Sequence, residues 1–143
     1  MMSTDPVGEP IIISKCNLGN YHGLLVVSDK GFAWRFQPGA FKNFRKAGNS
    51  IWVRWHDVLG IIPDKPEKGK IKIEIVKRKK GNIIKDGRGN PKIIRWRFIV
   101  QQNKTEQYSH FVNRRKDFYR IMSEIFEKNK TDTIPITSDS RIV

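Results

Sequence analysis

Residues 23–35 of this chain, GLLVVSDKGFAWR, contain two short apolar runs joined by a polar turn. The first run, Leu24–Ser28, ends in the turn Ser28-Asp-Lys-Gly31, where glycine suits a positive φ angle. From Phe32 to Phe36 the aromatic residues alternate with Ala33 and Arg35, as the inward and outward residues of a half-buried strand do. This segment therefore predicts a β-hairpin with one face in a core.

Similar apolar runs recur on both sides of the hairpin. The other predicted strands are Ile11–Cys16, Ile51–Trp55, Val58–Ile62, Lys70–Lys77 and Ile94–Val100. Turn residues separate them, including the glycine of 17–20 and the two prolines of 63–66. About seven short strands at this spacing are typical of a β-sandwich or barrel.

The apolar period changes after the last strand. Phe111, Phe118, Met122 and Ile125 recur at the spacing of one helical face. Thr105 is expected to cap this helix, with Glu106 in its first turn. A single amphipathic helix after a run of strands buries its stripe against them. We therefore predict an α+β fold, mostly β: a partly open barrel or sandwich of about seven antiparallel strands, capped by one C-terminal helix.

Length and composition restrict the organisation of the chain. Its 143 residues suit one domain, predicted at 10–129, with a disordered leader at 1–9 and a linker or tail at 130–143. A single cysteine, Cys16, excludes an intrachain disulfide and favours a reducing, cytoplasmic compartment. No apolar run approaches the roughly 20 residues of a membrane span. The net charge of +14 predicts a polyanionic partner.

Seven strands followed by one amphipathic helix resemble the pleckstrin-homology-like superfamily. Within it, residues 23–35 resemble the paired strands of GRAM-type domains, and Ile51–Ile62 resembles their next segment. The helical segment DFYRIMSEIF, Asp117–Phe126, resembles the helix of the GLUE domain of the ESCRT-II sorting complex. The resemblance implies a non-catalytic adaptor that binds ubiquitin, or a ubiquitin-like protein, through a partly apolar surface and acidic phosphoinositides through a basic one. Such an adaptor would associate with membranes peripherally.

The chain departs from lipid-binding members of that superfamily in one loop. Those members generally carry a cluster of lysines and arginines between their first two strands. The corresponding loop here, Asn17–His22, has only Lys15 and Lys30 near it. We therefore expect the anionic ligand to be bound elsewhere.

The connection between the last two predicted strands is the strongest candidate for that role. It contains seven cations, and Asp86 is its only acid: Lys77, Arg78, Lys79, Lys80, Lys85, Arg88 and Lys92. Arg95 and Arg97 are predicted on the outward face of the following strand, where they either extend the basic surface or pair with Glu74. Such charge runs are commonly interaction segments. The alternative partner for the 77–92 loop is nucleic acid, bound by a β-barrel domain.

A protein partner needs an apolar patch with a polar rim. Trp52 is predicted on the outward phase of its strand, and tryptophan is enriched at binding hot spots. The other candidates lie at the end of a strand and on the helix edge: Ile61, Ile62, Pro63, Ile121 and Ile125. Core packing is the alternative for each of them.

The sequence contains no catalytic or metal-binding pattern. His22, His56 and His110 lack the spacing of metal ligands. His56 and Asp57 are adjacent, but neighbours on a strand point to opposite faces, so a turn is expected there. We expect neither an enzyme nor a bound metal or cofactor.

Overall fold

The computed structural model describes residues 8–37 and 51–130. Most of the predicted leader and tail lie outside these ranges, and Lys130 is the last residue of the helix rather than the start of a linker. The elements, in chain order, are β1 (Ile12–Leu18), β2 (Tyr21–Val27), β3 (Gly31–Phe36), β4 (Ile51–Arg54), the 3-10 turn η2 (Trp55–Asp57), β5 (Val58–Pro63), the 3-10 turn η3 (Pro66–Lys68), β6 (Lys70–Val76), β7 (Arg78–Lys79), β8 (Asn82–Ile83), β9 (Ile93–Val100) and α1 (Tyr108–Lys130).

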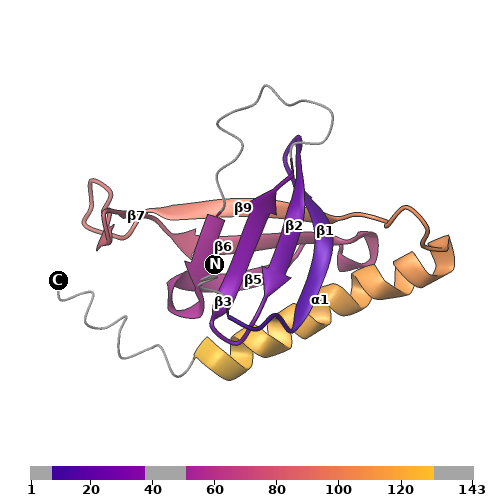
Figure 1. The fold of residues 1–143 in the computed structure, drawn as a ribbon. Coiled ribbons are helices and arrows are strands. Elements are labelled where there is room, and N and C mark those ends of the chain that lie inside the picture. The colour runs from indigo at the N-terminus through magenta and orange to yellow at the C-terminus, as the bar shows by residue number, and fades with distance from the viewer. Residues whose placement is uncertain (1–7, 38–50, 131–143) are drawn as a thin grey trace.

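Seven strands form one antiparallel sheet in the order β4-β3-β2-β1-β9-β6-β5. In Figure 1, β1–β3 cross β6 and β9 at a steep angle, so the sheet is strongly bent, and α1 packs along its lower side. Within the described residues β4 and β5 do not pair, and the sheet is therefore not closed into a barrel. The predicted α+β fold, an open sandwich of seven antiparallel strands with one C-terminal helix, is confirmed. This architecture is consistent with a pleckstrin-homology-like sandwich.

The predicted hairpin at residues 23–35 is β2 and β3. Its turn is closed by a hydrogen bond from the backbone N–H of Ser28 to the carbonyl of Gly31, 2.9 Å long. Gly31 has φ +154°, and a Cβ there would lie 2.0 Å from the carbonyl oxygen of Val53 on β4. The turn therefore requires glycine for its backbone angle and for the close approach of the next strand.

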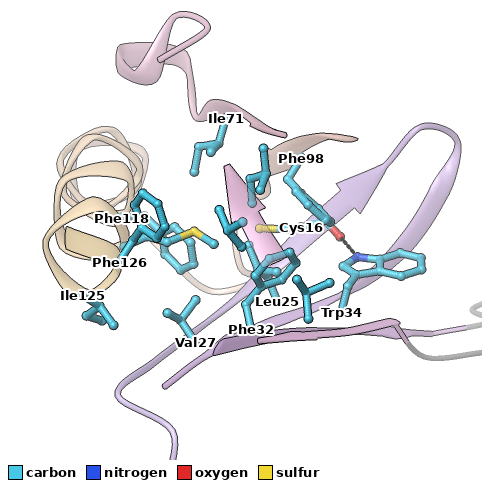
Figure 2. Close-up of a cluster of buried hydrophobic side chains, with 14 of the residues drawn as sticks. Cys16, Leu25, Val27, Phe32, Trp34, Ile71, Phe98, Phe118, Ile125 and Phe126 are labelled. Carbon is cyan, nitrogen blue, oxygen red and sulfur yellow. Dashed lines mark hydrogen bonds between the residues drawn. The ribbon is translucent and has the colours of Figure 1, made fainter. Parts of the chain in front are cut away.

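The core lies between the inner face of the bent sheet and α1. Figure 2 shows side chains of the sheet, such as Leu25 and Phe32, meeting Phe118 and Phe126 of the helix. Trp34 and Trp55 are buried, and the indole N–H of each donates to a backbone carbonyl. Trp34 Nε1 donates to Cys16 O at 3.0 Å, and Trp55 Nε1 donates to Ser28 O at 2.9 Å. Burial raises the pKa of the Cys16 thiol to about 12, which keeps this thiol protonated at neutral pH.

The helix begins three residues later than its predicted cap. Phe111 N–H donates to the carbonyl of Gln107, and Thr105 is not the N-cap. Glu106 instead accepts hydrogen bonds from Arg114 Nε at 2.7 Å and Nη2 at 2.8 Å. Arg114 also donates to Ser14 Oγ on β1 at 2.6 Å and to the carbonyl of Gln101 at 2.8 Å. This arginine therefore fastens the start of α1 to the sheet.

The Arg114 guanidinium lowers the pKa of Glu106 from 4.5 to about 2. Because the folded-state pKa lies below the unfolded value, the stabilisation from Glu106 is present above pH 4.5 and is lost as the pH falls toward 2. We expect Glu106→Gln to lower the free energy of unfolding by a constant amount near neutrality and by a shrinking amount between those two values. Urea unfolding at a series of pH values measures this difference. Glu124→Gln, at an exposed pair with Arg120, is the control. A stability loss in Glu106→Gln that does not change with pH would contradict the lowered pKa of Glu106.

Candidate anion-binding site

Residues 77–92 form a folded arm that projects from the end of β6 and β9, and it is called the basic arm below. In Figure 1 it lies at the far end of the sheet beside the label β7. Its first part is a tight hairpin in which Arg78 of β7 pairs with Ile83 of β8. The two turn residues, Lys80 and Gly81, have φ angles of 53° and 84°, the left-handed pair that a type I′ turn requires.

The second part of the arm is a turn organised by Asp86. The Asp86 carboxylate accepts the backbone N–H groups of Arg88 at 2.8 Å and of Asn90 at 3.0 Å. Backbone bonds from Lys77 N–H to Lys92 O and from Lys92 N–H to Ile84 O close the base of the arm. The only acid of the arm therefore bonds to backbone N–H groups, and it forms no ion pair with the arm's cations in the described structure.

Arg78 anchors the arm to the rest of the domain. Its Nε and Nη2 lie 2.9 Å from the carboxylate of Asp57 in η2, and its Nη1 donates to the carbonyl of Gly81. Arg78 was predicted to contact an anion, but its charge is already compensated by a partly buried carboxylate. It positions the arm.

The other six cations of the arm are exposed and make no ion pair within residues 8–37 and 51–130. They are Lys77, Lys79, Lys80, Lys85, Arg88 and Lys92. Six like charges on a short segment repel one another, so an anionic ligand relieves that repulsion as it binds. At an anionic bilayer each lysine or arginine contributes roughly 1 kcal/mol.

Arg95 and Arg97 lie on β9 next to the arm, and both are paired with acids. Arg95 Nε lies 2.6 Å from Glu74 Oε2, and Arg97 Nε lies 3.2 Å from Asp64 Oδ2. Of the two roles that the sequence left open, the structure shows the ion pairs. Both guanidinium side chains remain mostly exposed, at 63% and 66%, and exposed pairs of this kind are weak. Lys72 lies opposite Arg97 on β6.

The residues predicted to contact a protein partner do not form one patch. Ile125 was predicted both in the apolar stripe of the helix and as a contact residue on its edge. It is 9% exposed and lies in the core, as the stripe predicts, so the contact role is wrong. Ile61 packs against the same core, since it lies opposite the inward-facing Ile73. Trp52 packs on Val26 and Ala33 of the outer face, in a separate cluster. Ile121 also packs against that core while half-buried, Ile62 is half-buried and Pro63 is exposed.

The turn expected at His56 and Asp57 is present. The chain forms the 3-10 turn η2 there, and His56 Nε2 lies 3.5 Å from Asp57 Oδ1. Burial lowers the pKa of His56, and Arg78 holds Asp57, so this pair belongs to the anchor of the arm.

Among residues 8–37 and 51–130 there is no group of three or more histidine, cysteine or acidic side chains arranged to hold a metal ion. Within the same ranges no helix is long and apolar enough to cross a membrane. Models of known protein families give no match to this chain, and curated proteins give none either.

Sequence reasoning found the cations of the arm but missed its folded hairpins and its anchor. The turn could have been recognised from Lys80-Gly81, since a glycine in a two-residue connection signals a hairpin. The partnership of Arg78 with Asp57, 21 residues apart, has no local signal.

Proposed function

We propose that this protein is a non-catalytic recognition module that binds acidic phospholipid surfaces, phosphoinositides included, through the basic arm. The observation that carries the proposal is the set of six exposed cations on a hydrogen-bonded arm, none of them paired with an acid within the described residues. The arm is held in shape by Arg78 and Asp86, so little conformational entropy is lost when it meets a flat surface. The resemblance to GLUE domains supports a role for such a module as an adaptor in ESCRT-type protein sorting.

Apolar residues beside the cations favour a bilayer over nucleic acid. Ile93, at the base of the arm, is 46% exposed, and Ile83 and Ile84 within the arm are half-buried. A surface that combines lysines with accessible isoleucines suits the boundary between headgroups and acyl chains. Binding of a nucleic-acid strand would instead be expected to use exposed aromatic rings for stacking. The arm has no aromatic residue.

Sedimentation with lipid vesicles tests the proposal. We expect binding to phosphatidylcholine vesicles that contain phosphatidylserine or a phosphoinositide, and none to phosphatidylcholine alone. Raising the salt from about 0.1 M to about 1 M shortens the screening length from about 10 Å to about 3 Å and should release the protein. Tighter binding to single-stranded oligonucleotides than to the anionic vesicles, at equal salt, would overturn the proposal in favour of nucleic acid.

The family resemblance also implies ubiquitin as a protein partner. Of the residues expected to contact it, Pro63 is exposed, and Ile62 and Ile121 are half-buried. If ubiquitin is a partner, an amide NMR titration with ubiquitin should therefore shift the amide signals of β5 and of the middle of α1. The absence of such shifts at millimolar ubiquitin would rule out ubiquitin binding and leave the proposed membrane binding unaffected.

A further inference from the structure

Strand β9 has an open edge beyond the β1–β2 hairpin. β6 pairs with β9 along Ile93–Ile99, whereas β1 covers only Phe98–Val100. Within residues 8–37 and 51–130, no strand therefore pairs with Ile93–Arg97 on the β1 side. At 3.3 Å per residue this open edge is about 17 Å long.

The backbone groups on this edge can be assigned. Gln101 N–H donates to Lys15 O at 2.8 Å, so residue 101 turns its backbone groups toward β1. Alternate residues of an antiparallel strand turn their N–H and C=O groups to the same side. Ile93, Arg95 and Arg97 therefore turn their backbone N–H and C=O groups toward the open edge.

A cavity of about 350 Å³ lies at the point where β1 ends and the open edge begins. Its lining is of two kinds, one on each face of the sheet. Leu18 and Trp96 are partly buried and pack against the core, whereas Lys72, Arg95 and Arg97 belong to the outer face. Gly19 of the β1–β2 turn completes the wall without a side chain to obstruct it.

We propose that an extended acidic segment of a partner protein pairs with the open edge of β9 as an additional strand. Successive side chains of a strand point to opposite faces of its sheet. An added strand therefore directs every second side chain toward Lys72, Arg95 and Arg97 and the intervening ones toward Leu18 and Trp96. The site selects an alternating sequence, acidic–apolar–acidic.

The charges on the edge favour a different protein over a second copy of this chain. Two β9 edges paired with each other would bring four arginines together, and like charges opposite one another on a sheet are destabilising. Asp64 and Glu74 orient the two arginines without burying them. Carboxylates of an incoming segment can then share guanidinium donors that the intramolecular pairs leave unused.

The test uses a fluorescein-labelled peptide of sequence Glu-Ile-Glu-Val-Glu-Ile and the full chain. We expect its fluorescence anisotropy to report binding, and the amides of Ile93, Arg95 and Arg97 to become protected from hydrogen exchange. The double variant Arg95→Glu/Arg97→Glu should bind at least tenfold more weakly. Lys116→Glu/Arg120→Glu changes the net charge equally on the exposed side of α1 and should bind as the wild type does.

Two further peptides separate strand pairing from simple charge attraction. A peptide with the same residues but contiguous glutamates, and one with N-methylated alternate amides, should each bind at least tenfold more weakly. Equal affinity for all three peptides, or exchange protection on the basic arm in place of β9, would overturn the inference. Vesicle binding without peptide binding would remove this inference alone, and peptide binding without vesicle binding would remove only the proposed membrane function.

Discussion

Reversal of four charges on the basic arm, in the variant Lys79→Glu/Lys85→Glu/Arg88→Glu/Lys92→Glu, is expected to abolish binding to anionic vesicles. Each cation contributes roughly 1 kcal/mol at such a surface, so the loss of four weakens binding by about a thousandfold before any repulsion from the new carboxylates. Vesicle sedimentation at fixed salt measures the change. Lys80 is left unchanged because its φ of 53° belongs to the hairpin turn.

The matched control reverses the same number of charges outside the arm. Lys68, Lys104, Lys116 and Lys128 are all exposed, and changing all four to glutamate gives the same net charge. This control should keep most of the affinity, because exposed charges more than about 10 Å from the surface are screened at physiological salt. Equal losses of vesicle affinity in the two variants would mean that net charge, and not the arm, governs binding.

Replacement of Phe118 by alanine is expected to lower the free energy of unfolding by about 3–5 kcal/mol. Phe118 is 4% exposed and lies in the middle of the stripe that α1 presses onto the sheet, as Figure 2 shows. Removing the ring loses the free energy gained by burying it and leaves a cavity between the helix and the strands. Urea unfolding followed by circular dichroism gives the difference.

The control for Phe118 lies on the same helix. Lys116 is exposed, and Lys116→Ala should change stability by no more than about 0.5 kcal/mol. Truncation of a buried aromatic residue normally lowers the free energy of unfolding by several kcal/mol. If Phe118→Ala lowered it by less than about 1 kcal/mol, the docking of α1 on the sheet would be contradicted.

Local periodicity predicted the parts of the fold that depend on neighbouring residues. The alternation in Lys70–Val76 places Ile71, Ile73 and Ile75 in the core, and all three are buried there. The helical spacing of Phe111, Phe118 and Met122 correctly assigned the buried face of α1. A period of two or of 3.6 residues is a property of the element itself and can be recognised without its partners.

Interactions between distant parts of the chain were not predictable in the same way. Thr105 seemed a suitable cap, but Arg114 binds Glu106 and also Ser14, which is 100 residues away. Arg78 resembles the other cations in the sequence, and only its contact with Asp57 distinguishes it.

The most direct test of the central claim is a two-dimensional amide NMR titration of the chain with small bilayer discs. With discs that contain phosphatidylserine or a phosphoinositide, shifts and line broadening should centre on residues 77–92 and disappear in high salt. Neutral discs should leave the spectrum unchanged. Changes confined to α1 or to the outer face of β1–β4, with the arm unaffected, would show that the six exposed cations are not what binds the membrane.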